Sequence, residues 1–382
     1  MRFLSVLINI LPLTGLVHAA PPEDPIEVAA TKNVAKLHKT YQKNIQESIK
    51  HRKTGCTKKK LLRRKEWGTL SKKERLEYID AVYCLARKPG VTDLSVVPGA
   101  LTRYDDFVWS HVEQTPWVHN NGLFLGFHRQ FVHLYEQALR TECNYTAAQP
   151  YWDSSLSYLD PRNSTVFDGS PHSMGSNGIY IPNRPNTTIP LPGGGALYFP
   201  PATGGGCVHS GPFTPDKFVM RLGPIGTDPK GPNEGLGNNE RCLSRDLSLV
   251  YSANCRPSNV SDLVGETGDL AEFNKELDSS PAGIHGAGHF VMGPVAMDVY
   301  SSPNDPVFWL HHANVDRLWA MWQGQDLGGR VGQVWGTRTS SNVPPSENVT
   351  METPMSFGVV GGLKVLGDVV STVDGDLCYI YD

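Results

Sequence analysis

Beyond its first twenty residues, the 382-residue chain has no long apolar run. A helix needs about 20 consecutive apolar residues to cross a bilayer, so we expect a soluble mature protein without a membrane partner. The chain also lacks a strong excess of either charge, and its net charge of −3 argues against nucleic acid as a partner. Residues 50–65 are the exception, with nine Lys or Arg and no acid. A solvated surface explains this run better than a polyanion patch or a processing site at Arg52-Lys53.

Residues 1–19 have the features of a secretory signal peptide. Arg2 precedes a short apolar run that Pro12 interrupts, and Val17-His18-Ala19 forms a small-residue cleavage site. Five Asn-x-Ser/Thr sequons also indicate a secreted glycoprotein, and they begin at Asn144, Asn163, Asn186, Asn259 and Asn348. We therefore expect the mature protein to be extracellular.

Cysteine is scarce and widely spaced, with seven residues in the chain. The spacing excludes a zinc knuckle, and cysteines in an exported protein are expected to form disulfides. Spacing alone does not determine which cysteines pair, but we expect a bond between Cys56 and Cys84. The odd count leaves one thiol unpaired.

Apolar periodicity and capping signals predict a mainly α fold with long loops and a few short strands. The expected helices cover residues 27–50, 71–87, 102–115, 121–142, 270–277, 284–291 and 306–322. Ser71 and Glu74 form a capping box for the second of these helices. Residues 154–239 are crowded with Gly and Pro, and so long a loop usually shapes a site or covers a surface. Residues 363–381 alternate as strands do. We expect residues 20–55 to be a presegment or an outer helix, and residues 56–382 to form one catalytic domain.

Histidines form two clusters. The first contains His111, His119 and His128, which we place at the end of one helix, in a loop and within the next helix. The second contains His285, His289 and the adjacent pair His311-His312. His285 and His289 are four residues apart, so on a helix both rings lie on one face. Adjacent helical residues point about 100° apart, so the His311-His312 pair should not bind a single ion.

The clusters contain imidazole and no carboxylate or thiolate. Such sites suit copper or zinc and disfavour magnesium and calcium, which prefer oxygen. A metalloprotease helix would have Glu after the first histidine, but that position is Gly286. Two imidazole sites, each built from a helix pair, indicate a dinuclear centre in a four-helix bundle.

Two longer motifs surround these histidines. One runs from His119 through Phe127-His128-Arg129 to Glu136, and the other runs from Asp305-Pro306 to Asp316. Both resemble the copper signatures of the tyrosinase family, and they occur in the same order. Residues 67–85 resemble the opening of short secreted fungal tyrosinases and catechol oxidases, and Tyr379-Ile-Tyr381 is similar to the motif that closes the family's catalytic domain. The larger members continue into a lid domain, which we do not expect here.

The resemblance implies two copper ions. It assigns the first to His111, His119 and His128, and the second to His285, His289 and His312. His311 then packs beside the site without binding metal. It also implies an enzyme that uses O2 to oxidise small o-diphenols, and in addition o-aminophenols, to quinones. The oligomeric state stays open.

Several positions depart from the family pattern or affect specificity. Trp117 occupies a position where many relatives have a thioether-forming Cys. Glu276 matches a Glu that holds a phenol-activating water, but Gly286 replaces the Asn that assists it. Val299 matches the residue that controls access to copper. We therefore expect weak or absent monophenol hydroxylation, with a full tyrosinase as the alternative. A haemocyanin-like O2 carrier and a dizinc hydrolase are less favoured.

Some polar and aromatic residues are expected to be structural. His133, His172 and His209 should lie at the surface or have hydrogen-bond partners, and the tryptophans, Trp117 among them, should lie in the core. Asp316 can reach the His312 region or pair with Arg129 or Arg317, and the sequence does not choose between these.

Overall fold

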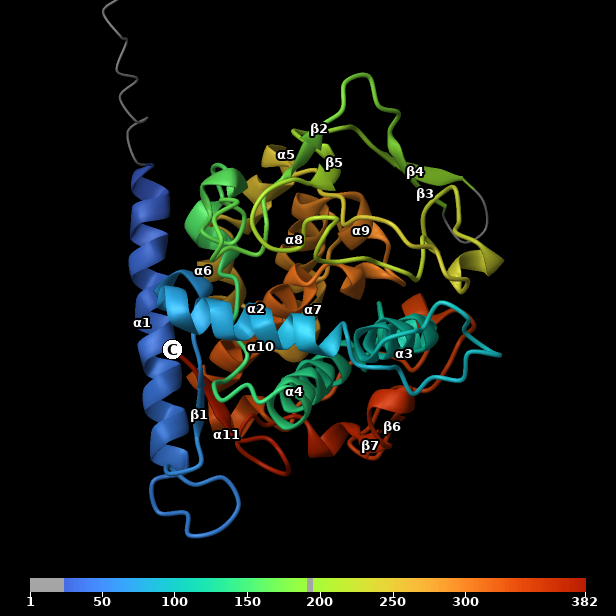
Figure 1. The fold of residues 1–382 in the computed structure, drawn as a ribbon. Helices are drawn as coiled ribbons and strands as arrows, with labels where there is room; N and C mark the ends of the chain where they lie inside the picture. Colours follow the sequence, from blue (N-terminus) through green and yellow to red (C-terminus); the bar gives the residue numbers. More distant parts are fainter. Residues whose placement is uncertain (1–23, 191–194) are drawn as a thin grey trace, which may run out of the picture.

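The structure, a computed structural model, describes residues 24–190 and 195–382. The signal peptide expected at residues 1–19 lies outside the described residues. Four helices form the central bundle: α3 (Arg103–Val118), α4 (Phe124–Glu142), α8 (Ile284–Met292) and α10 (Val307–Gln325) (Figure 1). Helix α10 packs against α4 and α8, and α3 packs against α4. The predicted mainly α fold with a four-helix bundle is confirmed.

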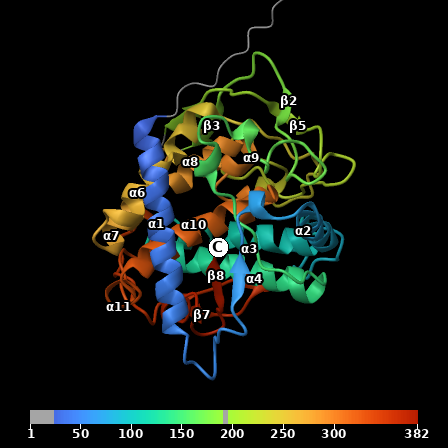
Figure 2. The ribbon, with the colours of Figure 1, turned by 90° about the vertical axis from the view of Figure 1, so that its left-hand side faces the viewer.

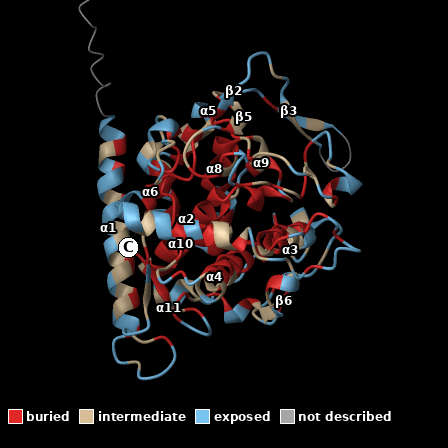
Figure 3. Ribbon diagram, in the orientation of Figure 1, coloured by how far each residue is buried: buried red, intermediate tan, exposed pale blue. Residues whose placement is uncertain are grey.

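The helices of the central bundle are more buried than the helices outside it. Buried residues fill α4, α8 and α10, whereas α2 (Lys72–Leu85) and α1 (Pro25–Ser48) expose their outer sides (Figure 3). Every residue of α10 from Val307 to Gly324 is buried. A helix that is buried on all sides can hold polar side chains only where they find partners, and α10 contains both His311-His312 and Asp316.

Capping determines where two of these helices begin. The capping box that the sequence predicts for α2 is present: the Ser71 hydroxyl accepts from the Glu74 amide, and the Glu74 carboxylate accepts from the Ser71 amide. Thr102 and Asp105 form a second capping box at the start of α3. Helix α3 continues through Pro116 to Val118, three residues beyond the predicted end.

Helix α1 lies on the outside of the molecule, so residues 25–48 form an outer helix (Figure 2). It packs against α10 and against α6 (Pro257–Gly265), a helix that the sequence did not indicate. Gln42 and Asn44 fasten it by donating to the carbonyls of Tyr381 and Gly324 at 3.0 and 2.9 Å. The domain boundary at residue 56 stays a prediction.

Strands are short, and those in the described residues form four two-stranded sheets. The pairs are β1 (Leu62–Arg64) with β8 (Tyr379–Tyr381), β2 (Gly178–Tyr180) with β5 (Gly205–Val208), β3 (Thr187–Pro190) with β4 (Ala196–Phe199), and β6 (Pro354–Met355) with β7 (Lys364–Val365). The first pair is parallel and joins the two ends of the domain, with Leu62 opposite Tyr379. Residues 363–381 are therefore extended mainly at their two ends, in β7 and β8.

The disulfides differ from the expected bond between Cys56 and Cys84, which is wrong. Cys56 bonds Cys378 because the parallel pairing of β1 and β8 brings their flanking residues together. Cys84 bonds Cys143 because α2 packs along α4 and both residues lie where these helices end. The remaining bond joins Cys207 to Cys242, and Cys255 is buried and free.

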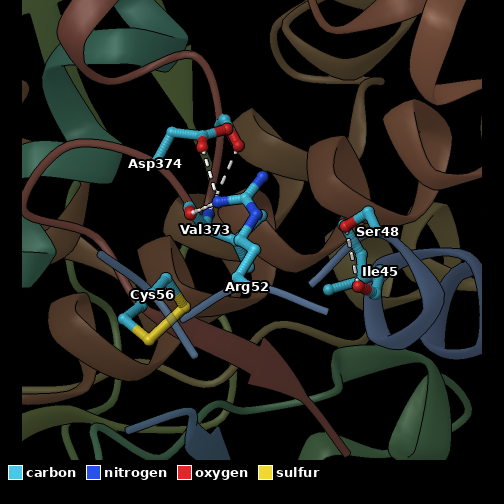
Figure 4. The surroundings of a disulfide bond; sticks show 8 residues. Ile45, Ser48, Arg52, Cys56, Val373 and Asp374 are labelled. Atoms are coloured by element: carbon cyan, nitrogen blue, oxygen red, sulfur yellow. Dashed lines mark hydrogen bonds and ion pairs between the residues drawn. A yellow bond between two sulfur atoms is a disulfide. The ribbon is translucent and has the colours of Figure 1, made fainter. Parts of the chain in front are cut away.

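The surroundings of the Cys56–Cys378 bond add polar contacts between the same two segments. One nitrogen of Arg52 donates to the Asp374 carboxylate at 2.7 Å and to the Val373 carbonyl at 2.6 Å (Figure 4). Part of the basic run thus has acidic partners: Arg52 pairs with Asp374 and Lys65 with Glu74. These contacts support a structural role for much of the run.

The buried carboxylate of Asp316 is the centre of a network of ion pairs and hydrogen bonds. Asp316 accepts from Arg129 Nε at 2.5 Å and from the Tyr379 and Tyr381 hydroxyls at 2.5 and 2.6 Å. Burial alone would raise the pKa of Asp316, but Arg129 and Arg64 hold this pKa below its usual value. Among the partners that the sequence left open, the structure therefore selects Arg129.

We predict that replacing Cys56 and Cys378 together by Ser lowers the free energy of unfolding by about 2–4 kcal/mol, because this bond restricts the unfolded chain. It closes a loop of sequence separation 322, whereas the Cys207–Cys242 bond closes one of 35. Urea unfolding should show a larger loss for the Cys56/Cys378 double variant than for the matched Cys207/Cys242 double variant. The opposite order would contradict the loop-entropy argument.

Candidate metal centre

The first histidine cluster lies between α3 and α4. His111 is in the middle of α3, not at its end as expected, because the helix is longer than predicted. His119 directly follows α3, and His128 is in α4. Each ring has its Nδ1 at a main-chain carbonyl: His111 at Tyr300 (2.8 Å), His119 at Thr115 (3.0 Å) and His128 at Phe124 (2.8 Å). With the ring proton on Nδ1, the Nε2 lone pair is free to bind a metal.

The second cluster lies between α8 and α10. His289 Nε2 is 3.2 Å from His285 Nε2 and 3.1 Å from His312 Nε2. Three neutral imidazole nitrogens at such distances cannot all be satisfied by hydrogen bonds to one another, because a lone pair needs a proton or a cation. In the first cluster, Nε2 of His111 and of His128 are buried without a hydrogen-bond partner. Both clusters therefore fit a metal ion.

The two clusters adjoin. The rings of His128 and His312 stack with their centroids 4.3 Å apart and their planes 14° apart. Phe308 lies 4.2 Å from the His312 ring and 5.1 Å from the His111 ring, between centroids. Phe124 similarly packs 4.6 Å from the His285 ring. The two clusters thus share the same aromatic neighbours.

His311 also comes close to the second cluster. One ring nitrogen of His311 and one each of His285, His289 and His312 lie within 4.8 Å of one another. However, Nε2 of His311 is 3.0 Å from the main-chain oxygen of His285, as a hydrogen-bond donor would be. The ring needs a glycine at position 288, since a Cβ there would lie 2.1 Å from its Cε1 atom.

Burial favours the neutral form of six of these imidazoles. Desolvation is the main cause, and it lowers the pKa of His119 to about 4 and that of His311 to about 3. Desolvation and the neighbouring histidines also lower the pKa of four further residues well below the usual 6.5. These residues are His111, His128, His289 and His312. Neutral imidazole is the form that binds metal. The absence of oxygen and thiolate donors from these clusters favours copper or zinc over magnesium and calcium.

The three residues expected to influence catalysis lie in different surroundings. Gly286 is buried in α8, where a Cβ would lie 3.1 Å from the Cα and Oγ atoms of Ser280. Glu276 is exposed on α7 (Leu270–Leu277). Val299 is 40% exposed, and its carbonyl is 3.5 Å from the Thr115 hydroxyl. In the part of the chain that the structure describes, Glu276 makes no hydrogen bond or ion pair with a histidine of either cluster, so its role stays a prediction.

Sequence reasoning missed two aspartates. Asp278 accepts from His285 Nδ1 at 2.6 Å. Asp298 accepts from four main-chain amides, those of Ile225, Gly226, Tyr300 and Ser301. It thereby holds the loop whose Tyr300 carbonyl orients His111. An Asp that precedes a turn is a recognisable signal, but nothing local in the sequence links Asp278 to a histidine seven residues away.

The predicted environments of Trp117 and His133 are wrong. Trp117 is 57% exposed rather than in the core, because it lies on the outer side of α3 near its end. His133 is buried in α4, and its Nδ1 has no hydrogen-bond partner. Neither residue belongs to a histidine cluster.

A family model described as the common central domain of tyrosinase matches residues 101–325, more than half of the chain. The chain belongs to the tyrosinase family. Tyrosinase-like protein orsC of Emericella nidulans is 41% identical over 307 residues, covering 76% of this chain and 82% of that protein. Tyrosinase P of Aspergillus terreus is 35% identical over 327 residues, with coverages of 83% and 91%.

Further relatives agree. N-acetyl-6-hydroxytryptophan oxidase ivoB of Emericella nidulans is 37% identical over 341 residues, covering 84% of this chain and 92% of that protein. The fold is similar to the solved structure of a mutant polyphenol oxidase from Thermothelomyces thermophila, with a TM-score of 0.86 at 37% identity. The match covers 92% of this chain and 98% of the polyphenol oxidase chain. Family membership implies a copper oxidase that uses O2 on phenolic substrates. Among the described helices, none has the length and hydropathy needed to cross a membrane.

The burial of His133 predicts a pH dependence of stability. Desolvation lowers the pKa of His133 to about 4, whereas an unfolded histidine titrates near 6.5. Between these values the unfolded chain binds a proton that the folded chain does not, so stability falls as the pH falls, by at most about 1.4 kcal/mol per pH unit from this residue. Urea unfolding of the metal-free protein at several pH values should give a shallower slope for His133→Gln. Equal slopes would contradict this assignment.

Proposed function

We propose that this protein is a secreted dicopper oxidase that converts o-diphenols to quinones, and also o-aminophenols to quinone imines, with weak or absent monophenol hydroxylation. The supporting observation is the pair of adjoining histidine clusters, in which burial lowers the pKa of His111, His119, His128, His289 and His312. The first copper would be held by His111, His119 and His128, and the second by His285, His289 and His312.

Copper, when bound, supplies the redox steps that pass electrons from the phenol to O2. Two o-diphenols release four electrons and four protons, which reduce one O2 to two waters and leave two quinones. The protein's part is to orient donors and exclude water. Main-chain carbonyls fix the rings of the first cluster, and Phe124 and Phe308 cover the space between the clusters.

The preference for diphenols is supported by the surroundings of Gly286. A diphenol needs less help with deprotonation than a monophenol, for which the family resemblance implies an Asn at this position and a nearby Glu. Gly286 has no side chain, and Ser280 fills the space beside it. Glu276 is exposed. The half-exposed Val299 is small enough to admit a substituted ring.

A full tyrosinase is the alternative. It is favoured by the likeness to Tyrosinase P of Aspergillus terreus. The ivoB relative, an N-acetyl-6-hydroxytryptophan oxidase, adds hydroxylated indoles as a substrate class to test. Both alternatives use the same histidines. A hydroxylated indole would change the substrate, whereas a full tyrosinase would also insert an oxygen atom from O2 into the monophenol.

Secretion is supported by surface sequons and by three disulfides. Four of the sequon asparagines are exposed: Asn144, Asn163, Asn186 and Asn348. Asn259 is half-buried and its amide donates to the Asn254 carbonyl at 2.8 Å, so we expect it to be a poorer glycan acceptor. Cys84–Cys143 and the two other bonds require an oxidising compartment to form.

The test of the function is copper quantitation followed by O2 consumption with catechol, o-aminophenol and tyrosine. We expect two copper ions per chain, rapid O2 uptake with the first two compounds, and little with tyrosine. Rapid tyrosine hydroxylation would establish the full tyrosinase instead. Zinc without copper, or O2 binding without quinone formation, would overturn an oxidase function.

The ligand assignment on α10 makes a separate prediction. His312→Ala should bind one copper per chain and lose oxidase activity, because the second site then has two donors. His311→Ala should keep two copper ions, since this ring faces the His285 carbonyl. Both expectations are checked by measuring the number of copper ions per chain in each variant after dialysis. If His311→Ala loses the metal and His312→Ala keeps it, the register of the ligands is wrong by one.

A further inference from the structure

The six proposed ligands differ in the hydrogen-bond partner of Nδ1, the ring nitrogen that would not bind the metal. Three use main-chain carbonyls, as described above. Nδ1 of His289 and of His312 are buried without a hydrogen-bond partner. His285 alone has a carboxylate, that of Asp278, at 2.6 Å. Within the described residues, His285 is thus the one proposed ligand of the second site whose Nδ1 has a hydrogen-bond partner.

Asp278 is itself held in place. It ends α7, and its amide donates to the Asn274 carbonyl at 2.9 Å. Its carbonyl accepts from the Ser280 amide at 2.8 Å. The side chain is only 11% exposed. The carboxylate therefore approaches His285 from a fixed backbone.

The backbone of His285 is held from a different direction. His311 Nε2 lies 3.0 Å from the main-chain oxygen of His285. The segment after α7 thus holds the ring, and α10 holds the main chain. Two contacts from separate elements leave the His285 Nε2 atom little freedom relative to His289 and His312.

We propose that Asp278 is a positioning residue that aligns His285 for the second metal site, an inference that rests on the proposed dicopper function. The hydrogen bond keeps the ring proton on Nδ1 and directs the Nε2 lone pair to the metal. A carboxylate partner also makes the imidazole a stronger donor than a carbonyl partner does. The first site has no such carboxylate, so the second copper depends on Asp278 and the first does not.

The test compares Asp278→Ala and Asp278→Asn with wild type by competition with a copper chelator. Loss of such an outer partner typically weakens metal binding about 10–100-fold, and we expect this at one site per chain for Asp278→Ala. Asp278→Asn should lose less, because its amide oxygen still accepts from His285. Asp262, exposed on α6, provides matched controls: its Ala and Asn variants should bind both copper ions as wild type does.

The outcomes separate this inference from the function on which it rests. A wild type that does not bind two copper ions would overturn the dicopper proposal. A wild type with two sites and an Asp278→Ala variant of equal affinity would overturn only the role of Asp278. Weakening of both sites alike would also overturn it, since it would indicate general disruption. Unfolding of the metal-free variants should match that of the metal-free wild type, and Asp278→Asn retains the shape of the side chain if Asp278→Ala folds poorly.

Discussion

The ion pair between Arg129 and Asp316 is the contact on which the rest of the centre depends. Arg129 follows His128 on α4, and Asp316 lies one turn after His312 on α10. Their 2.5 Å contact fixes the register of the two helices, and the stacked rings of His128 and His312 lie on the same two helices. A buried charge without a partner is strongly destabilising, so a slip between α4 and α10 would cost both the ion pair and the alignment of the clusters.

The same carboxylate connects the centre to the ends of the domain. Asp316 accepts from Tyr379 and Tyr381 of β8, and β8 pairs with β1, whose Arg64 is buried against Glu136 of α4. Outside this layer, the Cys56–Cys378 bond and Arg52 join the same two segments. The closing segment thus stabilises the bundle by supplying hydroxyl donors to a charge that the bundle buries.

The sequence predicted the parts of this structure that depend on local patterns. Helical periodicity and the Ser71 capping box located α2, and the spacing of His285 and His289 placed both on one face of α8. The positions that failed depend on distant segments. Cys56 pairs with Cys378, 322 residues away, because a parallel strand pair brings them together, and the carboxylate at His285 comes from a turn with no periodic signal. Helix α6 was missed although it begins at Pro257, a residue that is common in the first turn of a helix.

The glycines of His285-Gly-Ala-Gly-His289 show how packing and specificity are coupled. Gly288 makes room for the His311 ring, whose Nε2 in turn meets the His285 carbonyl, so the second histidine of the His311-His312 pair can bind metal while the first supports the site. Gly286 lies directly against Ser280, so that a Cβ at position 286 would be 3.1 Å from the Cα and Oγ atoms of Ser280, at the turn that also presents Asp278 to His285. A side chain at position 286 would push on this turn. The substrate preference that we propose for position 286 and the alignment that we propose for His285 would therefore be linked through the turn that contains Asp278 and Ser280.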